Sequence, residues 1–228
     1  FTALNESILE HGIFIEISAE VEVKTPIHIH QIKQNPKISS TPRVLISLNK
    51  NSKACIFEFF SSQDKSIKLT KDKTPEESGP TTLNCPMTDI QLLHGAKLEH
   101  GRFLSEKSLL KSSILSYLRA CLQSESQLET IALSASGKLL RTETHVAMKG
   151  KNARSRIRGF SIAEQNQTLD QQVSVSHQSS ETKSDQFFRS IGLSQSKSIF
   201  NGKIIVPPMV NKVDANQLNQ NLILDQTA

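Results

Sequence analysis

Short runs in which apolar and β-branched residues alternate with polar ones recur along almost the whole chain. Because alternation with a period of two places successive side chains on opposite faces of an extended backbone, these runs predict β-strands. Polar turn clusters such as "NKNSK", "SASGK" and "EQNQT" separate them. The predicted strands are Gly12–Ile17, Ile27–Ile32, Val44–Leu48, Cys55–Phe60, Ile90–Leu93, Ile114–Leu122, Leu128–Leu133, Leu139–Met148, Arg154–Ile162, Leu169–His177, Asp185–Leu193, Ser198–Val206 and Gln217–Leu224.

The spacing of the turn clusters becomes regular from about Ser126 onward. Successive clusters lie roughly 11–17 residues apart, with one strand between each pair, and no exact sequence repeat accompanies them. A β-sandwich would also space its strands regularly, but its turns would supply more hairpin signals than the single Asn201-Gly202 pair. A β-solenoid, in which polar turns stack and small side chains fill a narrow interior, explains the rhythm equally well. The pattern leaves both folds open.

Two segments depart from the strand pattern. Ser105–Leu122 mixes helical and alternating periodicities and is the best helix candidate in a chain with few helix signals. Ser61–Pro86 contains "KDKTPEESGP" and has low hydrophobicity, which predicts a long loop.

Composition favours the narrower β architecture. Aromatic residues make up 5% of the chain, there is no Trp, and Tyr117 is the only tyrosine. Aliphatic and small side chains must therefore fill the interior, which suits a layered solenoid better than a wide sandwich with an aromatic centre. The length of 228 residues fits one large β-rich domain over residues 1–228.

The number of cysteines and the hydropathy of the chain indicate the cellular compartment. Cys55, Cys85 and Cys121 form no C-x-x-C pair, and an odd count argues against a secreted disulfide framework. No apolar run approaches the ~20 residues of a membrane-spanning helix. We therefore expect a cytoplasmic protein with no membrane span.

Positive charge is concentrated in one window. The net charge is +5, and Lys138–Arg158 alone holds seven Lys/Arg and one Glu. Within it Arg154, Arg156 and Arg158 alternate, which places three guanidinium groups on one strand face. Nucleic-acid binders usually add stacking aromatics, and this region offers only Phe160, so we expect no nucleic-acid partner. A solvated face is the simpler interpretation, and a β-helix that binds or cleaves an anionic polysaccharide is the alternative.

Residues for catalysis or metal binding do not assemble in the sequence. His28 and His30 share a strand face, but no third ligand is visible near them. His94 and His100 flank "HGAKLEH" and are expected to cap a turn. No nucleophile elbow or phosphate-binding glycine loop is present, and the aspartates are scattered. We expect a non-catalytic protein that binds no metal and no cofactor itself.

Both ends of the chain resemble one known family. "FTALNESILEHGIFIEIS" and "VEVKTPIHI" are similar to the entry strands of the SufB/SufD iron–sulfur cluster assembly proteins, and "FNGKIIV" matches the family's F-N-G-K-I-x-V. "NKVDANQLNQNLIL" resembles its K-T-D-A-x-Q-x-N-x-N-L-L-L. His177, Ser184 and Gln186 fit the frame H-x-x-P-x-C-x-S-x-Q, whereas Ser180 and Thr182 stand in place of its Pro and Cys.

The resemblance implies a right-handed parallel β-helix and a scaffold role. It implies that SufB and SufD pair through the last strands of their β-helices, that SufC supplies ATP turnover, and that an iron–sulfur cluster is held only transiently by the complex. Gln220 stands where SufB carries a cysteine, so the chain looks SufD-like. Helical domains flank the core in the family, and we expect both of them and the last strands of the β-helix to be missing here. Open strand edges would also allow a homodimer.

The candidate site residues follow from this resemblance and from the charge pattern. The interface or rung candidates are Asn216, Gln217, Asn219, Gln220, Asn221 and His177, and the basic patch is Arg154, Arg156 and Arg158.

Overall fold

The chain is almost entirely β-strand. The computed structural model describes residues 2–7, 12–33, 38–62, 82–105, 112–135, 137–164 and 166–224. A single short helix, α1 (Thr2–Ser7), precedes the strands in these ranges. The strands are β1 (Gly12–Ile17), β2 (Ile27–Lys33), β3 (Arg43–Leu48), β4 (Lys53–Ser62), β5 (Thr82–Asn84), β6 (Met87–Leu92), β7 (Lys97–Ser105), β8 (Ser112–Leu122), β9 (Gln127–Ala135), β10 (Leu139–Met148), β11 (Arg154–Ala163), β12 (Thr168–His177), β13 (Lys183–Gly192), β14 (Lys197–Ile205) and β15 (Asp214–Ile223).

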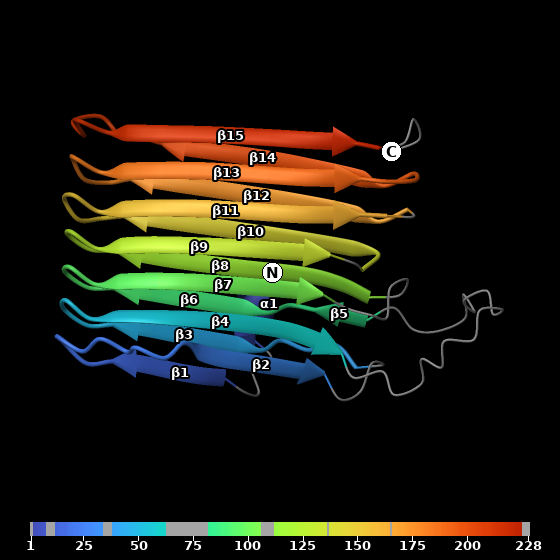
Figure 1. Cartoon of the computed structure of the whole chain (residues 1–228), viewed down its shortest axis with the longest axis horizontal. Helices are drawn as coiled ribbons and strands as arrows, with labels where there is room; N and C mark the ends of the chain where they lie inside the picture. Colours follow the sequence, from blue (N-terminus) through green and yellow to red (C-terminus); the bar gives the residue numbers. More distant parts are fainter. Residues whose placement is uncertain are drawn as a thin grey trace.

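The strands form two sheets, and every pairing within them is parallel. Sheet A has 8 strands, in the order β1-β3-β6-β8-β10-β12-β14 with β5 paired to β8, and sheet B has 7, in the order β2-β4-β7-β9-β11-β13-β15. Consecutive long strands thus alternate between the sheets. In Figure 1 the strands of sheet B lie in front and run to the right, as seen for β11, β13 and β15. The strands of sheet A lie behind them and run to the left, and each later coil lies above the one before it. This is the right-handed parallel β-helix predicted from the sequence.

Inward-facing side chains stack in columns along the solenoid axis. One column in sheet A consists of Leu48, Leu92, Leu122 and Met148, which align from coil to coil and are fully buried. Strand neighbours about 4.8 Å apart keep such side chains in van der Waals contact along the whole column. The interior is therefore narrow, and this column of it is filled by aliphatic side chains and a methionine, as the low aromatic content indicated.

The turns that lead from sheet A to sheet B repeat one backbone conformation. A residue with positive φ recurs at the equivalent position of each of these turns. In most coils the N–H of this residue donates a hydrogen bond to a carbonyl of the next coil, that of the residue immediately before the equivalent position. This conformation costs a non-glycine residue roughly 1–2 kcal/mol, which the bond between coils helps to offset. The residues are Glu20, Asn51, Gly95, Glu125, Asn152, Glu181 and Lys212. Since their side chains differ, the repeat is structural and leaves no sequence repeat.

Most predicted strands are confirmed, and three predictions need correction. The strand β7 was missed, because the sequence pattern suggested a turn between His94 and His100. The helical interpretation of Ser105–Leu122 is wrong, because Ser105 ends β7 and β8 occupies Ser112–Leu122. The predicted loop Ser61–Pro86 is too long, since β4 extends to Ser62 and β5 begins at Thr82; residues 63–81 lie outside the described ranges.

The turn after β10 yields a stability prediction. A methyl group added at Gly150 would collide with the backbone of Gln123 and Ser124 in the preceding turn. Because backbone atoms cannot rotate away, we expect Gly150→Ala to lower the free energy of unfolding by about 1–3 kcal/mol, measured by urea denaturation. Gly12→Ala is the matched control, since its added carbon meets only the Arg43 carbonyl oxygen at 3.3 Å. Equal stability of the two variants would contradict the tight stacking of the turns.

Candidate functional site

β14 and β15 form the last coil among the described residues. Each of them ends its sheet there and pairs with one described neighbour. The β15 side chains are far more exposed than those of β13, and Leu222 and Ile223 are 52% and 63% exposed. Within the described residues this coil therefore has two unpaired strand edges (Figure 1).

The amides of β15 divide between its two faces. Gln217, Asn219 and Asn221 align with the buried residues Gln186, Phe188 and Ser190, so they face the interior. Asn216 and Gln220 align with Asp185 and Arg189 and face outward.

Two of these amides bond to the coil beneath. Gln220 Oε1 accepts a hydrogen bond from Arg189 Nε at 3.0 Å. Ser190 Oγ donates to Asn221 Oδ1 at 2.7 Å. The amide of Gln217 lies against Gly202 of β14, where any larger side chain would collide with it. The amides therefore bind the last coil to the one below it, with chemistry that a further strand could also use.

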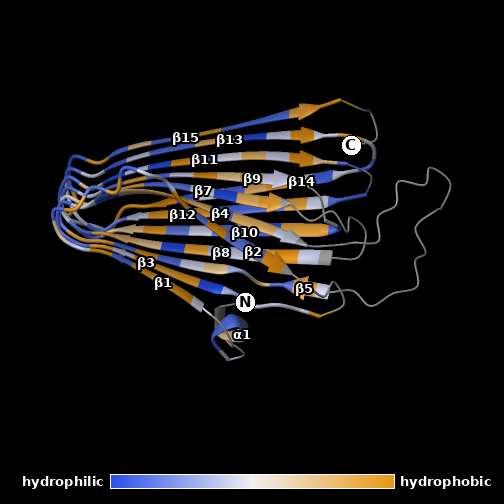
Figure 2. Ribbon diagram, turned by 60° about the horizontal axis from the view of Figure 1, so that its bottom comes forward, coloured by the Kyte–Doolittle hydropathy of each residue, from blue (hydrophilic) through white to orange (hydrophobic). Residues whose placement is uncertain are grey.

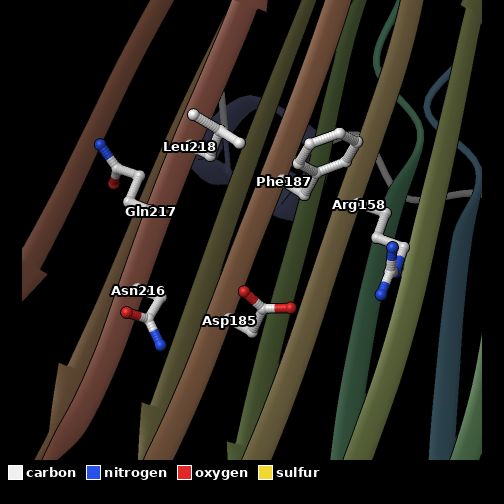
Figure 3. A pocket seen from close by; sticks show the side chains of 6 residues that line it. All are labelled: Arg158, Asp185, Phe187, Asn216, Gln217 and Leu218. Carbon is white, nitrogen blue, oxygen red and sulfur yellow. The ribbon is translucent and has the colours of Figure 1, made fainter.

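A shallow hollow lies on the outer face of sheet B next to β15 (Figure 3). Its lining combines a cation, an acid, amides and two apolar side chains: Arg158, Asp185, Phe187, Asn216, Gln217 and Leu218. Figure 3 shows Gln217 directed away from the other five. None of these groups pairs a nucleophile with a base, so this surface is suited to recognition.

His177, at the end of β12, is fully buried. Its Nδ1 lies 2.8 Å from Thr182 Oγ1 and its Nε2 lies 3.0 Å from Ser184 Oγ. Burial lowers the pKa of His177 from its ordinary value of 6.5. The imidazole is therefore neutral at physiological pH and links β12 to the next turn and to β13. Thr182, where the family frame has a cysteine, contacts this ring.

The three arginines of β11 face outward in a row, as predicted. Arg156 forms an ion pair with Glu129 on β9. For Arg154 and Arg158 no ion pair is found within the described part of the chain. The positive charge of this arginine row on sheet B is therefore only partly neutralised by acidic side chains.

The rest of the basic window lies elsewhere on the solenoid. Arg141 belongs to sheet A, where it contacts Asp170 at 2.8 Å and Glu143 at 2.7 Å. Lys151 lies in a turn, 3.4 Å from Glu181. The window is thus divided among two sheets and a turn, which does not favour the alternative of a continuous groove for an anionic polysaccharide.

A buried ionic cluster inside the solenoid was missed by the sequence analysis. Glu58 on β4 and His100 and Arg102 on β7 are all at most 3% exposed. Glu58 Oε1 lies 2.8 Å from His100 Nε2 and 3.8 Å from Arg102 Nε, and it accepts a 2.8 Å bond from Thr88 Oγ1. Burial alone would raise the pKa of Glu58, but the bond with His100 and the charge of Arg102 outweigh it and hold this pKa below its usual value. The alternation in "CIFEFF" could have indicated this cluster, because it places Glu58 on the same, inward strand face as Ile56.

His28 and His30 share one face of β2, as predicted, and lie against aromatic rings. His30 stacks on Phe59 with ring centroids 4.7 Å apart, and His28 contacts Phe57 edge-on at 5.6 Å. No group of three or more metal-ligating side chains occurs among the described residues. His100 does not cap a turn, because it lies within β7. No helix in the described part of the chain is long and apolar enough to cross a membrane.

The fold is that of a parallel β-solenoid. The chain matches the family model "SUF system FeS cluster assembly, SufBD core domain" over residues 30–228. It therefore belongs to the SufBD core family, as the sequence resemblance indicated.

Two curated relatives support this assignment. An iron–sulfur cluster assembly SufBD family protein from Synechocystis sp. is 21% identical over 230 residues, which cover 100% of this chain and 49% of that protein. The chloroplastic protein ABCI7 from Arabidopsis thaliana is 26% identical over 191 residues, which cover 83% of this chain and 37% of that protein. The chain thus spans half or less of the length of these relatives.

The ionic cluster predicts a specific sensitivity to substitution. We expect Glu58→Ala to lower the free energy of unfolding by about 3–5 kcal/mol, because Arg102 would remain charged and buried without its counter-ion. The double variant Glu58→Leu/Arg102→Leu removes both charges and should recover part of the loss in urea denaturation. A double variant no more stable than Glu58→Ala would contradict the ion pair as the cause.

The buried imidazole of His177 predicts that the free energy of unfolding depends on pH. Its folded-state pKa lies below the unfolded-state value, so the unfolded chain binds the proton more tightly, and stability falls as the pH drops through and below 6.5. Between about pH 7.5 and 5.5, wild type should lose more stability than His177→Gln, whose side chain does not titrate. Urea denaturation at both pH values measures this difference, and identical losses would exclude His177 as the source.

Proposed function

We propose that this chain is a non-catalytic, SufD-like scaffold in iron–sulfur cluster assembly, whose last coil pairs with the corresponding coil of a SufB-like subunit. The observation that carries the proposal is that β14 and β15 end the two sheets of the described residues, in a chain of the SufBD core family. Unpaired strand edges bind other strands readily, and a partner that adds a strand covers them.

The backbone of β15 is suited to such pairing. Asp214 and Leu224 donate their N–H groups to carbonyls of the coil beneath. Because backbone N–H groups alternate in direction along a strand, the N–H groups of odd-numbered residues such as Asn219 point to the free edge. The exposed side chains of Leu222 and Ile223 would add apolar contact to these bonds.

The roles of the other components follow from the same proposal. Gln220 in place of the SufB cysteine makes the chain a supporting subunit, and the cluster is cargo of the complex. The free thiols Cys55, Cys85 and Cys121 all lie outside β14 and β15. A SufC-like ATPase would bind through the helical segment that follows the core in the family, and the complex would act in the cytoplasm. A homodimer through the same edges is the competing arrangement.

Substitution of Asn219 tests the pairing. Asn219→Pro removes one N–H from the free edge and leaves the bonds to β13 in place, so it should weaken binding to a purified SufB-like subunit by at least about tenfold. Asn219→Ala is the matched control, because it removes the amide side chain but keeps the N–H. Isothermal titration calorimetry under reducing conditions measures both affinities.

Three outcomes would contradict the proposal. These are no association of wild type with the SufB-like subunit, equal affinity of the Pro and Ala variants, and a homodimer that the SufB-like subunit cannot displace in sedimentation experiments.

A further inference from the structure

The outer face of sheet B carries an apolar band that runs along the solenoid axis across the strands. Its residues align from strand to strand in three neighbouring rows. The band consists of Phe57, Ile131, Phe187 and Leu218 in the first row, Phe59, Phe103, Leu133 and Phe160 in the second, and Ile32, Ala135, Ile162, Ile191 and Leu222 in the third. The orange ends of β13 and β15 in Figure 2 mark its upper part.

Much of the band is accessible to solvent. Ile32, Ile131, Leu218 and Leu222 are 37–52% exposed, and the other members are partly buried. A contiguous apolar surface that is exposed to solvent in this way is typical of an interaction site.

Two arginines lie within the band. Arg158 belongs to the first row, and Arg189 to the second. Arg189 lies 4.9 Å over the Phe187 ring and donates one hydrogen bond, to Gln220. Among the described residues neither arginine forms an ion pair, whereas Arg43 and Arg119 on the outer face of sheet A are each 2.7 Å from Asp89. The band therefore offers two cations beside apolar side chains, and neither is neutralised by an ion pair among the described residues.

The dimensions of the band fit an α-helix. Seven strands at a spacing of ~4.8 Å give a length of about 29 Å, and three rows two residues apart give a width of about 13 Å. A helix of about 20 residues is 30 Å long and roughly 10 Å across. We propose that this band binds an amphipathic α-helix of a partner protein, with an apolar stripe against the phenylalanines and acidic residues against Arg158 and Arg189.

A second copy of the chain fits the band less well. Two such bands face to face would bury roughly 800 Å² in total, below the ~1,200 Å² of stable interfaces. The arginines of the two copies would also meet in an apolar environment, which is unfavourable. The band is a sheet face and the last coil is a strand edge, so this proposal does not depend on pairing with a SufB-like subunit.

Two synthetic peptides of about 20 residues test the proposal. They share one leucine stripe, which is flanked by glutamates in the first peptide and by lysines in the second. Fluorescence anisotropy at fixed ionic strength should show at least tenfold tighter binding of the glutamate peptide to wild type. The double variant Arg158→Glu/Arg189→Glu should instead prefer the lysine peptide. Because an unfolded protein would not show this inverted preference, the result would also show that the variant is folded. The control Lys50→Glu/Lys203→Glu makes the same charge change on exposed residues away from the band and should keep the wild-type preference.

Several results would overturn the proposal. Equal affinity for both peptides would show that charge does not select the ligand. An unchanged preference in the arginine double variant would place the binding elsewhere. Self-association of wild type that the arginine double variant alters in sedimentation experiments would identify a second copy as the occupant.

Discussion

Parallel, in-register stacking of one coil on the next is the constraint on which the whole molecule depends. Each inward side chain meets the residue at the same position of the neighbouring coils, so columns such as Leu48, Leu92 and Leu122 form without any contact between distant parts of the solenoid. The turns from sheet A to sheet B obey the same constraint, because an equivalent residue in each has a left-handed conformation and in most of them bonds to the next coil. Stability is therefore a sum of contacts between neighbouring coils, and a substitution is felt mainly by the coils on either side.

The same constraint explains why the proposed pairing lies at the last described coil. An inner coil satisfies its backbone groups on two sides, whereas among the described residues β14 and β15 do so on one. The forces that would add a partner strand are those that already join β13 to β15: ladder hydrogen bonds, contacts of aligned apolar side chains, and amide bonds such as that between Asn221 and Ser190. The proposed interface therefore needs no chemistry beyond that of the coils themselves.

Sequence reasoning found most of the strands but missed β7. The strands from β9 to β13 were predicted from their alternation and from the turn clusters between them, although β13 places Ser184, Gln186 and Ser190 inward. In β7 the inward positions are occupied by His100 and Arg102 as well as by Leu98 and Leu104, so alternation did not reveal the strand. Their partner Glu58 lies 42 positions before His100, and only the stacking of β4 on β7 brings these groups together. The amides of β15 were chosen as candidates from the sequence, but their partners Arg189 and Ser190 depend on the register between coils.

Outward residues have a freedom that inward residues lack, and the two outer faces use it differently. On sheet A, Arg43, Arg119 and Arg141 each contact a carboxylate, so charge is neutralised within the face. On sheet B, Arg158 and Arg189 lie among phenylalanines and leucines. Neither pattern is required by the coil, because the narrow interior restricts the inward residues only. A partly exposed apolar row whose cations form no ion pair costs solvation free energy in the isolated chain, and a partner that covers the apolar side chains and supplies acids would recover it.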